Sequence, residues 1–421
     1  MNAIEEARTL PARSLDFWFD YTCPYAYLGS TRAQAVADRM GVKLTWQPLL
    51  LGGVLKANGQ PQNLFATRSA ARVAYDAEDM KRWAKRLGVE LSMPAGHPLR
   101  SVEALRATIA TNVDPAVVAA FYRAYWIEGR AISSPDVIAD VVTKAGYDAE
   151  AILAAIATDS IKDDLRARTD RAIALGVFGV PAWIVDGEHL YWGQDRIEQV
   201  EGVRRASTPA ADAPKTGKVL EVFWDFSSPF AYLGTTQVDA LAKRTGATVV
   251  WHPMLLGGLF KSLGGPDVPI ATFSEAKQRW LLSDLERWAR VWGVPYKWPS
   301  RFPTNSLKAL RLYFALPAEH RDRYRAATFR AMWADDEDIT DDAVLARCVG
   351  DERVAKAAFA TIGDDEVKAA LRESTNEAHA RGVFGAPTFI VGDDLYWGQD
   401  RLDLVEDALV ETRSDDRALR A

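Results

Sequence analysis

Two short stretches of the chain carry residue types that could do sulfur chemistry. Residues 20–30 read DYTCPYAYLGS, and residues 225–235 read DFSSPFAYLGT. In each stretch, a Cys or Ser stands directly before a proline that suits the first turn of a helix. Unpaired N–H groups and the helix dipole stabilise negative charge at such a place. Cys23 could therefore hold a thiolate. Ser228 could donate to an anion, although serine at this position is ordinarily an N-cap.

A second repeated signal surrounds two further prolines. Val180-Pro181 and Ala386-Pro387 each follow the tetrapeptide Gly-Val-Phe-Gly and precede a predicted strand. A cis proline here would expose the backbone of the preceding residue to a peptide-like ligand. A proline that merely begins a strand is the alternative. The repetition of the whole tetrapeptide favours the first interpretation.

These repeats belong to a duplication of the entire chain. A shift of 205 lays WQPLLLGGVLK (46–56) on WHPMLLGGLFK (251–261), and LYWGQDR occurs identically at 190–196 and 395–401. The blocks keep one order at near-constant spacing, which indicates two homologous domains. We place them at 14–204 and 218–415. The linker between them, 205–217, is rich in Ala, Pro, Ser and Thr.

The two halves share one predicted order of elements. In the first half, strands are expected at 15–21 and 42–51 around a helix at 24–41, with LLGG at the end of the second strand. A mainly helical stretch covers roughly 62–176. Two strands at 181–187 and 189–193, joined at Asp186-Gly187, and a helix at 194–205 complete the half. The sequence thus predicts an α/β fold of two tandem thioredoxin-like domains. Each has a helical domain inserted between its β-α-β and β-β-α parts.

Composition narrows the functional classes. The 421 residues carry a formal charge of −6, which argues against a nucleic-acid or membrane-surface binder. There are two cysteines, one in each half, so a disulfide framework is not expected. Cys348 has the pattern of a buried helix residue. The five histidines recur at no matching positions, so we expect no shared metal site. We find neither a signal peptide nor a membrane helix, and we expect a cytoplasmic protein.

The motifs D-x-x-[CS]-P-[FY]-A-Y-L-G, LLGG, GVFGxP and YWGQDR together resemble one family. It is the 2-hydroxychromene-2-carboxylate isomerase and kappa-class glutathione transferase family, a branch of the DsbA-like thioredoxin superfamily. The resemblance covers nearly all of both halves. It implies one glutathione per domain, with the serine at position 228 holding the glutathione sulfur as a thiolate. Cys23 departs from that pattern.

The resemblance also implies the other contacts to glutathione. The residue before the cis proline would pair its backbone with the cysteinyl part, the pair after WG would hold the γ-glutamyl end, and a lysine could meet the glycyl carboxylate. The implied residues are Val180, Pro181, Gln194, Asp195 and Lys56 in the first half, and Ala386, Pro387, Gln399, Asp400 and Lys261 in the second. Gln replaces the Ser that is typical of kappa-class enzymes. Asn305 would line the substrate cleft, where the first half has Arg100.

The motifs and the family resemblance are compatible with three functions. The leading one is a glutathione-dependent isomerase or transferase that acts on a small electrophile, either aromatic or conjugated, as in aromatic catabolism. The alternative is a thiol–disulfide oxidoreductase acting through Cys23, but Ala26 stands where a resolving cysteine is needed. The third is a scaffold, in which one domain pairs with the other as in a homodimer. No nucleic-acid or membrane partner is expected.

Overall fold

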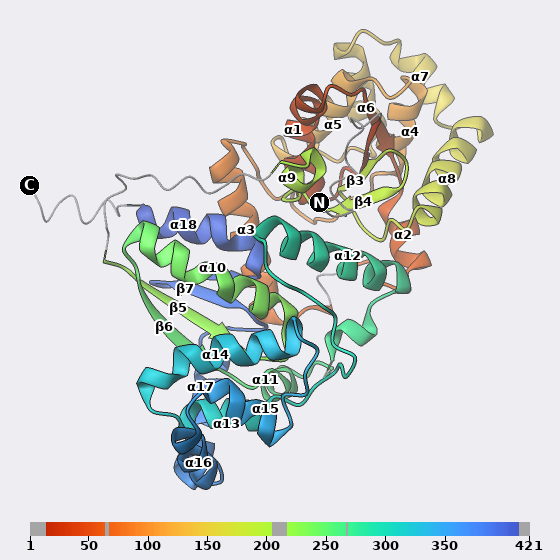
Figure 1. The fold of residues 1–421 in the computed structure, drawn as a ribbon. Coiled ribbons are helices and arrows are strands. Elements are labelled where there is room, and N and C mark those ends of the chain that lie inside the picture. Colours follow the sequence, from red (N-terminus) through yellow and green to blue (C-terminus); the bar gives the residue numbers. More distant parts are fainter. Residues whose placement is uncertain (1–13, 64–66, 204–216, 267, 412–421) are drawn as a thin grey trace, which may run out of the picture. The chain divides into compact units, whose positions relative to one another are not determined.

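The computed structural model describes residues 14–63, 67–203, 217–266 and 268–411 (Figure 1). Their contacts form two compact units. The first contains the described residues within 1–68, 76–205 and 274–280, and the second contains those within 69–75, 206–273 and 281–421. Apart from Gly217, the predicted linker at 205–217 lies outside the described residues.

A four-stranded sheet forms the centre of the first unit, in the order β2-β1-β3-β4. Strand β1 (Leu15–Phe19) is wholly buried and pairs in parallel with β2 (Leu44–Pro48), with Phe17 opposite Trp46. On its other side β1 pairs antiparallel with β3 (Ala182–Val185), which forms a hairpin with β4 (His189–Trp192). The hairpin turns at Asp186 and Gly187, both at positive φ, as its Asp-Gly sequence predicts.

The helix between β1 and β2 begins and ends where the sequence predicts. Helix α1 (Pro24–Met40) has Pro24 in its first turn and ends at Gly41, whose φ of 67° is the left-handed C-cap conformation. It contacts β1 and β2, and it also contacts the short helix α9 (Ile197–Glu201) at the end of the unit. The strand–helix junction therefore holds Cys23 beyond the carboxyl end of β1, an inner strand of the sheet.

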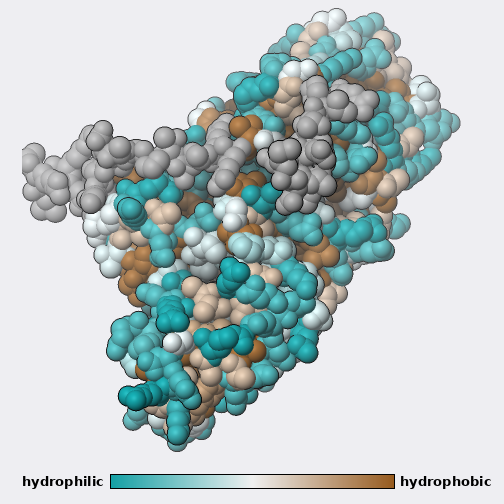
Figure 2. All heavy atoms as spheres, in the orientation of Figure 1, coloured by the Kyte–Doolittle hydropathy of each residue, from teal (hydrophilic) through white to brown (hydrophobic). Residues whose placement is uncertain are grey.

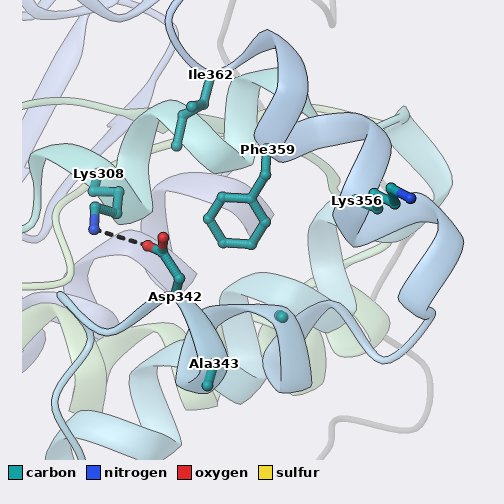
Figure 3. A pocket seen from close by; sticks show the side chains of 7 residues that line it. Lys308, Asp342, Ala343, Lys356, Phe359 and Ile362 are labelled. Atoms are coloured by element: carbon teal, nitrogen blue, oxygen red, sulfur yellow. Dashed lines mark hydrogen bonds and ion pairs between the residues drawn. The ribbon is translucent and has the colours of Figure 1, made fainter.

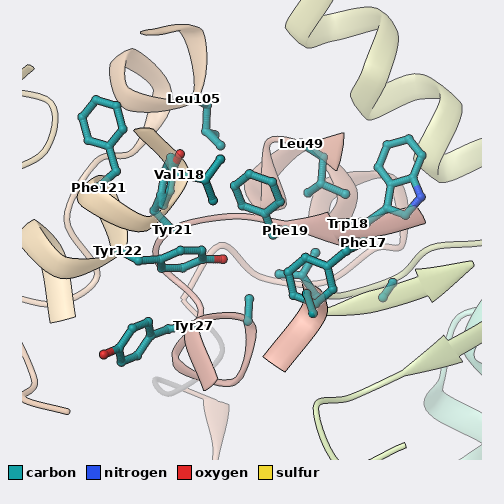
Figure 4. Close-up of a cluster of buried hydrophobic side chains, with 14 of the residues drawn as sticks. Phe17, Trp18, Phe19, Tyr21, Tyr27, Leu49, Leu105, Val118, Phe121 and Tyr122 are labelled. Atoms are coloured by element: carbon teal, nitrogen blue, oxygen red, sulfur yellow. The ribbon is translucent and has the colours of Figure 1, made fainter. Parts of the chain in front are cut away.

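The helical segment lies between β2 and β3. It comprises α2 (Leu51–Ala57), α3 (Ala70–Leu87), α4 (Val102–Ala110), α5 (Pro115–Trp126), α6 (Pro135–Lys144), α7 (Ala149–Ala155) and α8 (Asp159–Ala174). It is joined to the turn that follows β1 by Trp126, whose indole N–H donates to the carbonyl oxygen of Tyr21 at 2.8 Å. Aromatic and aliphatic side chains from β1, α1, α4 and α5 fill the core between them (Figure 4).

The second unit repeats this architecture with a sheet in the order β6-β5-β7-β8. The strands are β5 (Val219–Trp224), β6 (Thr248–Pro253), β7 (Thr388–Val391) and β8 (Asp394–Trp397). Helix α10 (Pro229–Thr245) and helix α18 (Leu402–Val410) lie side by side along the sheet (Figure 1). The intervening helices are α11 (Leu256–Ser262), η3 (Pro269–Thr272), α12 (Glu275–Trp292), α13 (Leu307–Ala315), α14 (Ala318–Trp333), α15 (Asp342–Val349), α16 (Glu352–Thr361) and α17 (Asp365–Ala380).

Two predicted boundaries are wrong. The LLGG stretch was expected at the end of a strand, but in both units it opens a helix, α2 or α11. The parallel ladder stops at Pro48 and Pro253, because proline has no N–H to continue it. The helix expected at 194–205 is also shorter than predicted: it occupies Ile197–Glu201, and residues 194–196 form a turn before it.

The face seen in Figure 2 is mostly hydrophilic, with hydrophobic residues in scattered small groups. Within the described ranges, the large apolar side chains that remain exposed are Val73, Met93, Val203, Val219, Val250 and Leu282. No described helix is both long enough and apolar enough to cross a membrane.

Candidate functional site

Ser228 is the N-cap of α10 and joins two elements of the second unit. Its Oγ accepts the N–H of Ala231 at 3.1 Å and donates to the carbonyl oxygen of Ala386 at 2.9 Å. The side chain is only 4% exposed, so the hydroxyl is largely removed from water. A serine placed in this way has helix N–H groups on one side and the proline loop on the other.

Cys23 takes the same backbone position in the first unit but makes one of these two contacts. Its φ and ψ of −97° and 117° nearly equal those of Ser228, at −101° and 116°. The thiol donates to the carbonyl oxygen of Val180 at 3.1 Å, but it makes no side-chain cap. Burial raises the pKa of Cys23 to about 12, although the N–H groups of Ala26 and Tyr25 oppose that shift. The thiol is therefore protonated at neutral pH.

The two prolines of the repeated GVFG motif are cis. The bonds are Val180-Pro181 and Ala386-Pro387, which confirms the cis geometry expected from the sequence. That the preceding backbone pairs with a peptide-like ligand stays a prediction. In each unit, the carbonyl oxygen before the cis bond accepts a hydrogen bond from the helix start, from Cys23 in the first unit and from Ser228 in the second. The carbonyl oxygen of the cis proline itself accepts the N–H of a glycine after the hairpin at 2.9 Å, Gly193 in the first unit and Gly398 in the second. The proline loop is thus tied to both the start of the helix and the end of the hairpin.

A glycine in α10 permits the close approach of these parts. A Cβ placed on Gly234 would lie 3.1 Å from Cγ of Pro387 and 3.2 Å from Cβ of Gln399. These distances are shorter than ordinary carbon contacts. The glycine of the AYLG motif therefore brings α10, the cis proline and the Gln-Asp pair together.

The Gln-Asp pairs lie beside the same loops. Gln194 and Gln399 are almost fully buried, and the amide Nε2 of Gln194 has no hydrogen-bond partner among the described residues. Arg32 donates to the backbone oxygen of Gln194 at 2.7 Å and also contacts its side-chain oxygen. The carboxylate of Asp195 pairs with Arg196 at 2.9 Å, and that of Asp400 pairs with Arg401 at 3.1 Å.

The remaining predicted residues are less closely joined to this cluster. Lys56 and Lys261 are exposed in the last turns of α2 and α11, and no described contact links them to the serine, the cis proline or the Gln-Asp pair. Asn305 is exposed before α13, where its Oδ1 accepts the N–H of Leu307 at 2.9 Å. Its counterpart Arg100 is instead held by Glu103, at 2.8 and 2.9 Å.

The tryptophans of the two YWG motifs pack against aromatic neighbours. Trp192 contacts Phe178 and Trp280 within the first unit, with ring centroids 5.0 and 5.2 Å apart. In the second unit Trp397 contacts Phe384 at 5.2 Å, and Tyr75 exchanges hydrogen bonds of 3.2 and 3.3 Å with its backbone. Both indoles are therefore packed among aromatic side chains of their own unit. Tyr75 and Trp280 were not singled out in the sequence.

A buried aspartate organises the loops around Ser228, and the sequence analysis assigned it no role. Asp225 is 0% exposed and accepts the N–H groups of Ser227 at 2.9 Å and Leu256 at 2.7 Å. Burial raises the pKa of Asp225, although these N–H groups and the Ser306 hydroxyl favour its charged form. Asp20 makes equivalent contacts in the first unit, to Thr22 and Leu51. The signal that could have revealed these residues is the Asp that both copies of the motif share at their first position.

A cluster of metal-ligand residue types lies between the second sheet and α17. Glu221, His252 and Glu377 could each offer an atom within 4.8 Å of the others. Arg381 already donates to both oxygens of Glu221, at 2.6 and 2.8 Å, and His252 lies 2.9 Å from the same carboxylate. A guanidinium thus supplies the positive charge that this carboxylate needs.

The second unit also has two hollows that do not include the predicted site residues. One of about 560 Å³ lies between α13, α15 and α16, where Phe359 and Ile362 face Lys308 and Asp342 (Figure 3). Lys308 is paired with Asp342 at 2.8 Å. The other, of about 390 Å³, lies between α11, α13 and α17.

Comparison with known proteins found a family model, similar proteins and a similar solved structure. A family model described as a DSBA-like thioredoxin domain matches residues 14–203 and again 219–410. The 2-hydroxychromene-2-carboxylate isomerase of Sphingobium xenophagum is 30% identical over 195 residues, which are 46% of this chain and 99% of the isomerase. Human glutathione S-transferase kappa 1 is 28% identical over 203 residues, covering 44% of this chain and 88% of the transferase. A solved 2-hydroxychromene-2-carboxylate isomerase is 27% identical, with a TM-score of 0.41, and the match covers 48% of this chain and 98% of that one.

Proposed function

The chain belongs to the DsbA-like thioredoxin domain family, within the group of 2-hydroxychromene-2-carboxylate isomerases and kappa-class glutathione transferases, and contains that domain twice. From this premise we propose that it is a glutathione-dependent enzyme. It would isomerise a conjugated electrophile or conjugate it to glutathione, and Ser228 of the second unit would hold the reacting sulfur.

The position of Ser228 is the observation that carries the proposal. Its hydroxyl stands at the N-terminus of a 17-residue helix and within hydrogen-bond distance of the carbonyl before a cis proline. Turning the O–H from that carbonyl toward a bound thiolate gives the sulfur a donor in a desolvated place. Such charge-assisted hydrogen bonds are stronger than neutral ones. The helix N-terminus adds to the stabilisation of negative charge.

The neighbouring groups suit the rest of the tripeptide. The backbone at Ala386 offers an edge for the cysteinyl residue, as extended peptides commonly pair with exposed backbone. Asp400 supplies a carboxylate for the γ-glutamyl ammonium, and Arg401 beside it supplies a cation for the carboxylate of the same end. Lys261 would reach the glycyl carboxylate only with its long, exposed side chain.

The proposed reaction begins when the thiolate adds to an electrophilic carbon of the conjugated substrate. A C–S bond forms, and the π electrons move onto the carbonyl oxygen to give an enolate. The former double bond is now single and rotates. When the enolate collapses, it expels the thiolate and restores the double bond in the other geometry, so glutathione is not consumed. In a transferase reaction, the enolate instead takes a proton from water and the adduct leaves.

The first unit is proposed to differ in this chemistry. Cys23 offers a weaker hydrogen-bond donor than a serine hydroxyl. Its raised pKa keeps it protonated, and Ala26 provides no resolving thiol, so the oxidoreductase alternative receives little support. Gln194 nevertheless presents a buried amide N–H₂ that a bound γ-glutamyl group could accept from.

Calorimetric titration of the full chain with glutathione tests the proposal. Ser228→Ala should weaken binding of glutathione but not of S-methylglutathione, which has no thiolate. Loss of a hydrogen bond to a charged group, about 1.5–3 kcal/mol, corresponds to a decrease of roughly tenfold to a hundredfold in kcat/KM for a conjugated enone. Cys23→Ala should leave that rate unchanged. If glutathione does not bind the wild-type chain saturably, the proposal fails.

Asn305 is proposed to face the electrophile rather than glutathione. Because its Oδ1 also caps α13, Asn305→Asp is the matched control that keeps this acceptor. A substrate contact predicts that both Asn305→Ala and Asn305→Asp change kcat/KM for the electrophile while the affinity for glutathione stays constant. A purely capping role predicts that Asn305→Asp behaves like the wild type.

A further inference from the structure

The groove between α11, α13 and α17 has a distinctive charge. Its volume is about 390 Å³, and its lining contains three cationic side chains, Arg311, Lys368 and Arg372. Ser262, Thr375 and Asn376 add polar groups, and no acidic residue is among the described residues that line it. The groove shares none of the residues predicted to bind glutathione.

The three cations are only weakly neutralised within the second unit. Arg311 projects from α13, and its Nε is buried without a hydrogen-bond partner in the part of the chain that the structure describes. Lys368 and Arg372 lie four residues apart on α17 and so share one face. Among the described residues, the ion pair of Lys368 is with the fully exposed Asp365, at 3.2 Å. An exposed pair of this kind contributes little and can be displaced.

The first unit has the same three cations but balances them differently. Arg106, Lys162 and Arg166 are their counterparts in the duplicated sequence, and the Nε of Arg106 likewise lacks a described partner. There, however, Asp163 is paired with Arg166, and Asp170 takes the place of Asn376. The second unit has Ala369 at the position of Asp163. These two substitutions remove carboxylates that are near the arginine in sequence, whereas Glu366 and Glu373 replace Ser160 and Ala167 on the same helix without lining the groove.

We propose that the groove of the second unit binds a small organic polyanion, a phosphate ester or a polycarboxylate. Two guanidinium groups can each form paired hydrogen bonds with phosphate or carboxylate oxygens, and the lysine adds a point charge. The volume falls within the range of pockets that hold small molecules. Glutathione is a poor match, because its ammonium group would meet three cations and no acid.

Calorimetric titration of the full chain at low ionic strength, with pyrophosphate and with citrate, tests the proposal. We expect a dissociation constant of about 1 mM or lower for at least one of the two probes. Arg372→Gln should weaken that binding at least about fivefold, and Arg311→Gln/Arg372→Gln should weaken it further. Arg372 is exposed, so its single variant should fold normally even if the double variant does not.

Arg166→Gln is the matched control, because it removes the equivalent exposed arginine from the first unit and changes the net charge equally. It should leave the affinity unchanged. Binding of pyrophosphate alone would identify phosphate esters as the ligand class, and binding of citrate alone would identify polycarboxylates. The proposal is overturned if neither probe binds saturably, or if Arg166→Gln weakens binding as much as Arg372→Gln.

Discussion

Ser228 donates its hydroxyl proton to the carbonyl oxygen of Ala386 across 2.9 Å. The same Oγ accepts the N–H of Ala231, so a single side chain caps a helix and holds the cis-proline loop against it. In the first unit Cys23 keeps the contact to the loop and lacks the cap. The duplicated chain thus offers a comparison of hydroxyl and thiol in nearly the same backbone geometry.

Cys23→Ser should stabilise the protein. The backbone angles at Cys23 match those at Ser228 within a few degrees, so a serine there can cap α1 without rearrangement. An N-cap bond typically contributes about 1 kcal/mol. Ser228→Ala should cost a similar amount. Both values can be measured as free energies of unfolding in urea, and a destabilised Cys23→Ser variant would contradict the prediction.

The thiol of Cys23 should react slowly with iodoacetamide at neutral pH. Burial raises its pKa to about 12, so the nucleophilic thiolate is scarce until the solution is strongly alkaline. Alkylation, followed by mass spectrometry of the Cys23 peptide, should accelerate as the pH rises. The urea-unfolded chain is the control. Equal rates for the folded and unfolded chains at pH 7 would contradict the prediction.

The same pKa shift also predicts how stability depends on pH. Folded Cys23 binds its proton more tightly than the unfolded thiol, whose pKa is about 8.5. The stabilisation that protonated Cys23 adds to the free energy of unfolding is therefore complete below the unfolded pKa, and it is lost as the pH rises toward the folded pKa. As the pH rises above about 8.5, the free energy of unfolding of the wild type should fall relative to that of Cys23→Ser.

Asp225→Asn should destabilise the second unit. The carboxylate accepts N–H groups on both oxygens, and an asparagine would turn its own N–H₂ toward one of them. An unsatisfied buried donor costs about 1–3 kcal/mol. Asp393→Asn, at an exposed position, is the control and should change stability by less than about 0.5 kcal/mol.

The pH dependence of this variant has a definite sign. Because burial raises the pKa of Asp225, the folded state binds the proton more tightly than the unfolded state does. The contribution of Asp225 to the free energy of unfolding becomes more favourable as the pH falls through the folded pKa toward the unfolded pKa of about 3.9. The stability gap between the wild type and Asp225→Asn should therefore widen in mild acid, and a constant gap would contradict this assignment.

The fold around the candidate site could be predicted because the residues concerned lie in short, repeated motifs. The α/β thioredoxin-like fold and the family were both predicted from these motifs, and both are confirmed. The junction at Cys23 and Ser228 follows from a strand, a proline and a helix pattern that are adjacent in sequence. The cis prolines were recognisable for the same reason, since four preceding residues repeat in both halves.

What the sequence could not show depends on contacts between distant segments. Asp225 meets Leu256, 31 residues away, and Ser306 still farther along the chain, and no local pattern connects them. The helices at LLGG were also missed, because a glycine pair weakens helix propensity and suggests a turn. In the structure the short helices are held by tertiary contacts: Asp225 and Thr375 accept the N–H groups of Leu256 and Leu255.

Gly234→Ala should destabilise the protein, whereas Gly257→Ala should stabilise it. Both glycines are in helices, where alanine is intrinsically preferred by about 0.5–1 kcal/mol. At Gly257 the new methyl group meets no atom within 4 Å, so this preference is realised. At Gly234 it meets Pro387 at 3.1 Å and Gln399 at 3.2 Å, and overpacking of this kind costs roughly 1–3 kcal/mol.

Urea unfolding of the Gly234→Ala and Gly257→Ala variants measures this contrast in stability, and calorimetry should also show weaker glutathione binding for Gly234→Ala. Equal stabilisation by both substitutions would show that the cis-proline loop yields freely, and that α10 does not fix its position.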